Sequence, residues 1–278
     1  MSALHIFVLA LIQGITEFLP ISSSGHLILL PVLTSWPDQG PLIDVSVHVG
    51  TLIAVLIYFR RDTAGLVCAA GGAVGLKGLK RSAEASGHYR LFWALVLATI
   101  PVVAVGLAFS VLGVVAHLRS PAIIASTSII FGLLLWWADT RFSAEKDMAD
   151  MKLKPALIIG LMQILSLIPG TSRSGVTITA GRMLGFNRPD AARFSMLLSI
   201  PTILGAGLLT AKDLIVQPDS AFIQTALVGV MLSCISALAA IHLFMKWLSK
   251  ASMTPFVIYR VLLGVGLFAL IGSGWLAA

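Results

Sequence analysis

Two short polar stretches interrupt otherwise apolar sequence, and they hold most of the side chains that could do chemistry. In the first, Gln13 and Glu17 are four residues apart and share one face of an expected helix, which Pro20 ends. Residues 22–25, Ser-Ser-Ser-Gly, can cap the next helix, with His26 one turn inside it. Hydroxyl groups and a glycine at a helix N-terminus can bind an anion. Capping requires one serine and neither Glu17 nor His26, so the pattern favours a binding site over an ordinary turn.

The second polar stretch, residues 169–177, supplies a cation. Gly170 and Gly175 allow a ligand to approach the backbone closely, and Arg173 presents a planar fork of donors that matches phosphate oxygens. An arginine that only extends to the membrane interface is the alternative, and two glycines with three hydroxyl groups around Arg173 argue against it. These hydroxyl groups belong to Ser172, Ser174 and Thr177.

The two polar stretches resemble each other. A shift of 150 residues places residues 11–25 on residues 161–175 and matches a leucine, a glutamine, two serines and a glycine. Ser23 then falls on Arg173, so one copy offers a candidate nucleophile and the other a cation. Chance similarity between two turns rich in serine and glycine is the alternative. We expect two repeats, at about 1–138 and about 155–278, within one domain that spans residues 1–278.

The elements that carry these residues are expected to lie in a lipid bilayer. Hydrophobic residues make up 58% of the chain and charged residues 11%, with a mean hydropathy of +0.97. Soluble domains carry about 25% charged residues, so a soluble fold is excluded, and the apolar content excludes disorder. Several apolar runs reach the roughly 20 residues that a spanning helix needs, without the alternation of a membrane β-barrel. The sequence therefore predicts an all-α polytopic membrane protein.

We predict six transmembrane helices and two re-entrant helical hairpins. The hairpins are segments 3–33 and 155–185, because a polar turn leaves each half too short to span the bilayer. Loops rich in lysine and arginine are expected in the cytoplasm, which makes the hairpins enter from opposite faces as an inverted repeat. Such repeats place the working site near the membrane midplane, at the broken helices. The predicted spans are 42–59, 90–111, 121–138, 194–211, 221–244 and 255–276.

The net charge of +7 is explained by these basic loops, so we expect no nucleic acid as a partner. Two cysteines, Cys68 and Cys234, show no metal-ligand spacing. Asp44 and His48 are four residues apart at the start of a span, and are a polar pair supporting the site, metal ligands or an interfacial pair. Arg182 is expected to mark the cytoplasmic end of its hairpin.

Serine, glycine, arginine and helix N-termini that converge at membrane depth indicate phosphate recognition. A glutamate and a histidine beside a serine indicate acid–base or nucleophilic chemistry on that phosphate. A phosphate within a membrane protein is typical of a lipid phosphate, and these residues alone leave a hydrolase and a carrier open. A lipid-phosphate flippase is the main alternative, because broken helices in inverted repeats are common in transporters. An ion channel or scaffold would not require these residues.

The sequence resembles the bacterial undecaprenyl-diphosphate phosphatase family linked to bacitracin resistance. The resemblance covers nearly the whole chain and is strongest in residues 13–26, with Glu-Phe-Leu-Pro-Ile-Ser-Ser-Ser-Gly-His, and in residues 169–177, Pro-Gly-Thr-Ser-Arg-Ser-Gly-Val-Thr. Segments 44–51 and 255–260 also resemble it. The first motif position is Gln13 rather than glutamate; the family admits either, so Glu17 is the one certain carboxylate of this motif.

This resemblance implies hydrolysis of undecaprenyl diphosphate to undecaprenyl phosphate and phosphate, which recycles the lipid carrier for peptidoglycan synthesis. It implies that Glu17, His26 and Arg173 are essential and that Ser23 is the nucleophile or a close phosphate contact. The spacing leaves His26 open as the nucleophile. The family also implies a divalent cation, Mg²⁺ or Ca²⁺, with Glu17 as a candidate ligand.

Further expectations follow from the same resemblance. It implies a site that opens to the extracytoplasmic side of the bacterial inner membrane. The oligomeric state stays open, with a homodimer as one option. The residues expected to bind the substrate are Gln13, Ser22, Ser24, Gly170, Ser172, Ser174 and Thr177.

Overall fold

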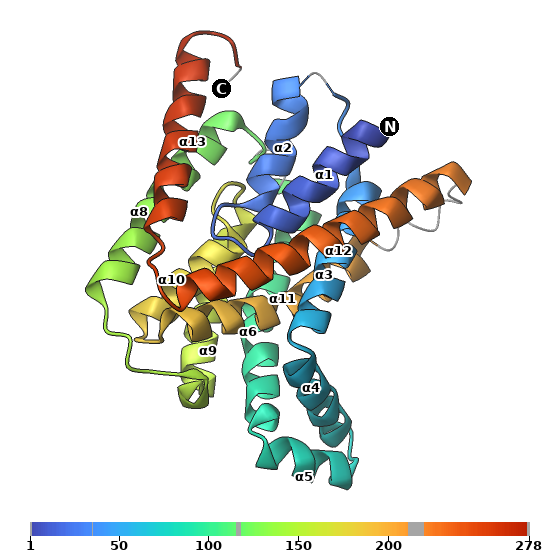
Figure 1. Cartoon of the computed structure of the whole chain (residues 1–278), viewed down its shortest axis with the longest axis vertical. Coiled ribbons are helices and arrows are strands. Elements are labelled where there is room, and N and C mark those ends of the chain that lie inside the picture. The colour runs from blue at the N-terminus through green and yellow to red at the C-terminus, as the bar shows by residue number, and fades with distance from the viewer. Residues whose placement is uncertain (1, 35, 115–117, 211–219, 277–278) are drawn as a thin grey trace.

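The computed structural model describes residues 2–34, 36–114, 118–210 and 220–276, and this part of the chain is helical without β-strands (Figure 1). The all-α prediction is therefore confirmed. The α-helices are α1 (Ala3–Thr16), α2 (Ser23–Thr34), α3 (Pro41–Tyr58), α4 (Arg60–Ala73), α5 (Lys77–Ala85), α6 (His88–Val111), α8 (Pro121–Arg141), α9 (Leu153–Gln163), α10 (Arg173–Met183), α11 (Arg188–Thr210), α12 (Ser220–Leu248) and α13 (Thr254–Gly272). Two short 3₁₀ helices are η1 (Met148–Asp150) and η2 (Ile164–Leu167).

Four helices are long and apolar enough to cross a membrane, namely α6, α8, α12 (over Ile223–Leu248) and α13. They coincide with four of the six predicted spans and confirm a multi-pass membrane protein. The predicted span 42–59 is helical as α3 and reaches this standard together with α4 as a bent pair. The predicted span 194–211 is helical as α11 up to Thr210, and residue 211 lies outside the described residues. The full count of six spans stays a prediction.

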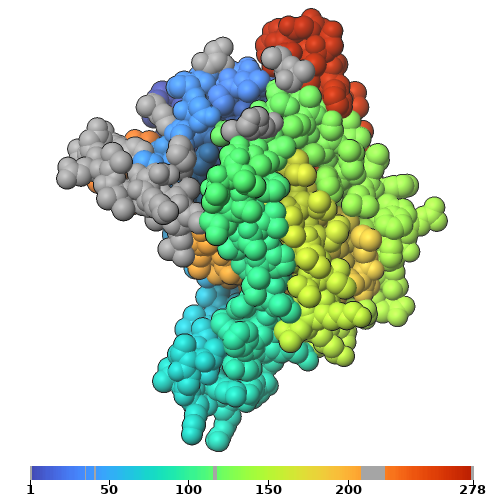
Figure 2. Space-filling view, turned by 180° about the vertical axis from the view of Figure 1, so that it is seen from behind, coloured from blue at the N-terminus to red at the C-terminus, as the bar shows by residue number. Residues whose placement is uncertain are grey.

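A sharp bend separates α3 from α4. The two helices meet at 95° around Phe59. After α4 ends at Ala73, a short turn leads into α5. Figures 1 and 2 show α4 and α5 as a projection from the main body of the molecule. Basic residues lie at the start of both helices, with Arg60 and Arg61 in α4, directly after the bend, and Lys77 in α5. Their charge agrees with the cytoplasmic location that the loop pattern predicts for this segment.

Both predicted hairpins are helical on either side of a break, as the sequence indicates. In the first, α1 ends at Thr16 and α2 begins at Ser23; in the second, α9 continues through η2 before α10 begins at Arg173. Ser22 and Ser172 precede the second helix of each hairpin, and both have positive φ angles, 73° and 72°. Few residues other than glycine adopt this conformation, so its presence at both places supports the predicted repeat. The membrane faces from which the hairpins enter stay a prediction.

Close packing of small residues holds the first hairpin and α3 against α12. Side chains at Gly14 of α1 and Gly50 of α3 would collide with atoms of Ser233 in α12. Helices in lipid associate largely through such close backbone approach. Phe18, which follows Glu17, is fully buried in the largest apolar cluster, together with residues of α3, α10 and α11. The core therefore fixes the break of the first hairpin beside the start of α10.

Candidate active site

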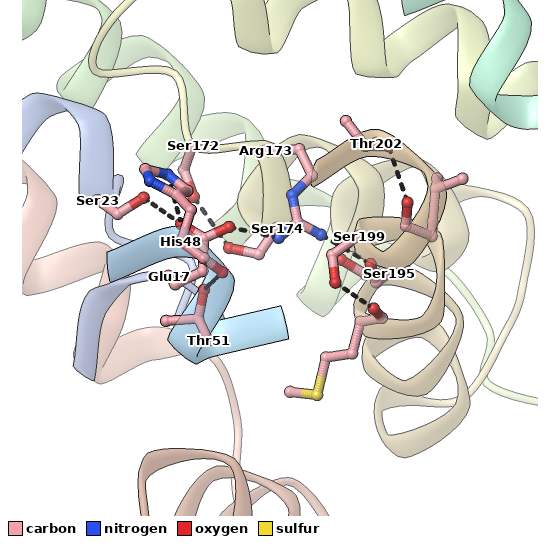
Figure 3. A network of polar contacts seen from close by, with 12 residues as sticks. Glu17, Ser23, His48, Thr51, Ser172, Arg173, Ser174, Ser195, Ser199 and Thr202 are labelled. Carbon is pink, nitrogen blue, oxygen red and sulfur yellow. Dashed lines mark hydrogen bonds and ion pairs between the residues drawn. The ribbon is translucent and has the colours of Figure 1, made fainter. Parts of the chain in front are cut away.

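Glu17 is the centre of a polar network at the end of α1 (Figure 3). Its side chain is 7% exposed. Gln13 Nε2 donates a hydrogen bond to Glu17 Oε2 at 3.0 Å, and Ser23 Oγ donates to the same oxygen at 2.6 Å. Arg173 Nη2 donates to the other oxygen, Oε1, at 2.7 Å. The predicted residues Gln13, Ser23 and Arg173 therefore all contact the Glu17 carboxylate, although Arg173 is 156 residues away from it in the sequence.

Arg173 is the first residue of α10 and is held from two sides. Besides its ion pair with Glu17, its Nη1 donates a 2.9 Å hydrogen bond to the Ser195 carbonyl in α11. Its guanidinium carbon lies 5.9 Å from the centre of the Phe18 ring, in cation–π range. Figure 3 shows the guanidinium between Glu17 and the serines of α11. This position allows Arg173 to bind an oxyanion beside Ser23 without a change of backbone.

His48 is a site residue that the sequence marked only weakly. Its Nε2 lies 3.7 Å from Glu17 Oε2, and its Nδ1 is 2.7 Å from the Asp44 carbonyl oxygen. The Asp44 carboxylate accepts a 2.8 Å hydrogen bond from Gln39. The spacing of Asp44 and His48 and the family resemblance of segment 44–51 were the available signals, and they did not distinguish an interfacial pair from a site pair.

A cavity of about 630 Å³ opens beside this network. Six predicted residues line it, namely Glu17, Ser22, Ser23, Ser24, Ser172 and Arg173. Asp44 and His48 line it from α3, and Ser166 and Thr202 were not predicted. Much of the remaining wall is apolar and comes from α3 and α11, with Val45, Val49, Leu52, Ile203 and Leu204. A polar end and an apolar wall suit a ligand with a charged head and a hydrocarbon tail.

Several predicted substrate-binding residues support the cavity instead of lining it. Ser174 Oγ donates to the Leu19 carbonyl at 2.8 Å and so ties the second hairpin to the first. Thr177 Oγ1 lies 2.7 Å from Ser195 Oγ, beside the carbonyl that holds Arg173. Gly170 has a φ of +85°, and a Cβ there would collide with the side chain of Thr127. Glycine is therefore required at this turn by the packing of α8.

His26 lies apart from this network. Its Nδ1 is 2.7 Å from the Ser22 carbonyl oxygen, and its Nε2 is 2.5 Å from the hydroxyl oxygen of Tyr259 in α13. The two rings stack with centroids 5.7 Å apart. Among the described residues, those that line the cavity do not include His26. The structure thus brings Glu17, Ser23 and Arg173 together and directs the His26 ring toward α13.

The donor set for a metal ion is small. Within the described ranges, no group of three or more His, Cys, Asp and Glu side chains could hold a metal ion. The cavity does contain two carboxylates, Glu17 and Asp44. Mg²⁺ is commonly bound by one or two carboxylates together with substrate phosphates and water, so this set fits a cation that the substrate helps to bind.

Known proteins that are similar to this chain belong to one family. The profile of the family described as bacitracin resistance protein BacA matches residues 6–266. An undecaprenyl-diphosphatase of Saccharophagus degradans is 51% identical over 274 residues, which cover 98% of this chain and 99% of that protein. Proteins with the same name from Teredinibacter turnerae and Ruegeria pomeroyi are 50% and 48% identical, over 96% and 97% of this chain and 99% of each relative.

Proposed function

Because this chain belongs to the bacitracin resistance protein BacA family, we propose that it hydrolyses undecaprenyl diphosphate to undecaprenyl phosphate and inorganic phosphate. The observation that carries the proposal is the contact of Ser23 and Arg173 with one carboxylate, Glu17, at the polar end of the cavity. A hydroxyl group bonded to a carboxylate and placed beside a guanidinium is suited to phosphoryl transfer. The product would return to peptidoglycan synthesis as the lipid carrier.

Ser23 is the proposed nucleophile. Its Oγ–H already donates to Glu17 Oε2 at 2.6 Å, so the carboxylate can take the proton as Oγ attacks the terminal phosphorus. The bond between that phosphorus and the bridging oxygen breaks, and undecaprenyl phosphate leaves with the electron pair. Water then attacks the phosphorus of the phosphoserine and the bond from phosphorus to Oγ breaks. Glu17 returns its proton to Ser23 Oγ, and inorganic phosphate leaves with the protons of the water. Attack by His26 instead would require its ring to leave Tyr259 and enter the cavity.

Arg173 supplies most of the charge stabilisation from the protein. Its fork can bind two oxygens of the terminal phosphate and offset the charge that spreads over them during transfer. The hydrogen bond to the Ser195 carbonyl fixes the plane of the guanidinium before the substrate arrives. Catalysis of phosphoryl transfer depends mainly on such positioning and charge stabilisation.

The rest of the cavity wall offers apolar side chains for the lipid and carboxylates for a cation. The apolar side chains of α3 and α11 would contact the isoprenoid chain near its diphosphate. We propose Mg²⁺ or Ca²⁺ as the cation, with Glu17 and Asp44 as the available carboxylates; when bound, it would neutralise diphosphate charge. We propose an inner-membrane location with the site open to the extracytoplasmic side, as the family resemblance implies; the basic loops bear on the orientation of the chain.

Phosphate release from undecaprenyl diphosphate by detergent-purified protein tests the proposal. We expect turnover with Mg²⁺ or Ca²⁺, loss with EDTA, and recovery when the cation is restored. The Glu17→Gln variant is the matched negative control. A flippase would act only across sealed vesicles, so wild-type protein that releases no phosphate in detergent would overturn the proposed hydrolysis.

A further inference from the structure

Arg260 of α13 is the largest of the fully buried side chains, with 0% exposure. Its guanidinium makes five hydrogen bonds, and all of them go to main-chain carbonyl oxygens. Two acceptors belong to α8: Nε donates to Ser128 at 3.1 Å, and Nη2 donates to Thr127 at 3.2 Å. Arg260 is thus bonded to a neighbouring helix through its backbone.

The other three acceptors lie in the two breaks of the hairpins. Nη1 donates to the Pro20 carbonyl at 3.2 Å in the first break. Nη2 donates to the carbonyls of Gly170 at 3.0 Å and Thr171 at 2.9 Å in the second break. One planar group therefore bridges both breaks. Carbonyls at broken helix ends lack helical partners, and at membrane depth an unpaired carbonyl is costly.

No ion pair in the described ranges involves Arg260. An arginine buried only for its charge would be expected beside a carboxylate. The Arg260 side chain instead has the length and the planar group that are needed to reach carbonyls in both breaks. Glycines make room for it, because a Cβ at Gly132 would lie 3.2 Å from Arg260 Cβ, and one at Gly175 would lie 2.8 Å from Nη1. Gly175 therefore faces Arg260, where the sequence suggested close approach of a ligand.

The bonded carbonyls immediately precede the reacting groups. Pro20 is three residues before Ser23, and Thr171 is two residues before Arg173. We infer that Arg260 is a positioning residue that sets the separation between Ser23 and Arg173, so that both reach one terminal phosphate. This inference rests on the proposed function, since it assigns Arg260 a part in the same hydrolysis without contact to the substrate.

The Arg260→Lys variant tests the inference in full-length protein. An ammonium keeps the charge but cannot bridge carbonyls in both breaks with the geometry of a fork. We expect kcat for undecaprenyl diphosphate to fall about 10²-fold, because a shift of about 1 Å in reacting groups has that effect. KM should stay within about threefold, since Arg173 and the apolar wall are retained. Arg260→Gln should lose at least as much.

Arg182→Lys is the matched control. Arg182 is also buried, at 2% exposure, and donates to the carbonyls of Phe186, Ser143, Phe142 and Asp139. Unlike Arg260 it also pairs with a carboxylate, that of Asp139 at 3.1 Å, and its acceptors lie away from the two breaks. Its variant should lower the thermal midpoint and leave kcat per folded molecule unchanged. If Arg260→Lys fails to fold, Gly175→Ala displaces the Nη1 end of Arg260 while retaining all five donors, and the same drop in kcat is expected.

The outcomes separate the two proposals. A wild-type protein that releases no phosphate contradicts the hydrolysis itself. An active wild type with a normal kcat for Arg260→Lys, or with a kcat loss no greater than that of Arg182→Lys at equal loss of thermal midpoint, overturns the positioning role alone. A loss of kcat in both Arg260→Lys and Arg260→Gln that clearly exceeds the loss in Arg182→Lys, with KM nearly unchanged, supports it.

Discussion

The breaks of the two hairpins have the same backbone and different chemistry. Ser22 and Ser172 share a positive φ, and each accepts a hydrogen bond from the amide three residues later, at 3.3 Å from Gly25 and 3.0 Å from Gly175. Each serine hydroxyl is also near a second one, Ser24 or Ser174, at 3.4 and 3.2 Å. This shared backbone and hydroxyl geometry is the structural feature that supports the predicted repeat.

The side chains that differ assign separate roles to the two breaks. Ser23 aligns with Arg173, and the carboxylate of Glu17 aligns with Leu167. The first break thus contributes a hydroxyl group and its proton acceptor, while the second contributes the cation. In the proposed reaction each break supplies a group that the other lacks, and Arg260 joins the two breaks through their carbonyls.

The largest effect is expected from Ser23→Ala, which removes the group that has no counterpart in the second break. Loss of a nucleophile should reduce kcat by at least ~10⁴-fold. Quenching in SDS at neutral pH preserves both phosphoserine and phosphohistidine, and with substrate labelled at its terminal ³²P it should trap label on wild-type protein and none on Ser23→Ala. Substantial turnover by this variant would exclude a phosphoserine, and label that persists on His26 would assign the nucleophile there.

Arg173→Ala removes the cation of the second break, and kcat should fall ~10³-fold by analogy with other arginines that stabilise phosphoryl transfer. Arg173→Lys should recover little of this loss, because one ammonium does not reproduce the two-pronged contact. Steady-state phosphate release measures both variants, with Arg188→Lys as the control, because Arg188 begins α11 and is not among the described residues that line the cavity. Full activity of Arg173→Lys would contradict the bidentate contact.

Glu17→Gln keeps the size of the side chain and removes its capacity to accept the Ser23 proton. The expected loss in kcat is ~10²-fold or more, within the range for general base catalysis. Leu167→Gln introduces the same amide at the aligned position of the second break and should leave kcat near the wild-type value. Equal losses in the two variants would show that the breaks are not functionally distinct.

The smallest effects test whether the breaks are equivalent in structure. Ser22→Ala and Ser172→Ala each remove one N-capping hydroxyl while leaving the backbone unchanged. Each should lower the free energy of unfolding by about 1 kcal/mol, the usual contribution of a cap. Thermal midpoints measured in one detergent allow the comparison. Effects that differ severalfold between the two would contradict their equivalence.

Much of this arrangement follows from local sequence. Apolar runs predicted α6, α8, α12 and α13, and the polar turns predicted both breaks, because length and hydropathy are local properties. The repeat and the loop charges together predicted that the two breaks meet at one site, while the direct ion pair of Glu17 with Arg173 is seen only in the structure. These local patterns are informative because backbone polar groups inside a bilayer must be hydrogen-bonded within the protein, which restricts the possible structures.

The remaining features depend on distant packing. His48 reaches Glu17 from α3, the Ser195 carbonyl orients Arg173 from α11, and Arg260 bridges the breaks from α13. Nearly every residue has a backbone carbonyl, so the type of residue at position 195 could not identify Ser195 as the acceptor. The direction of the His26 ring is likewise decided by Tyr259, far along the chain. The 95° bend after Tyr58 has no proline or glycine to mark it.

The ion pair of Glu17 and Arg173 also affects how inorganic phosphate would be released from the site. A phosphate that binds the guanidinium must compete with a carboxylate 2.7 Å away on the same α1–α10 contact. That competition works at departure as well as at arrival. Once water has released phosphate from Ser23, the deprotonated carboxylate can pair with Arg173 again and displace the phosphate. Strong binding of the phosphate during the reaction therefore need not slow product release.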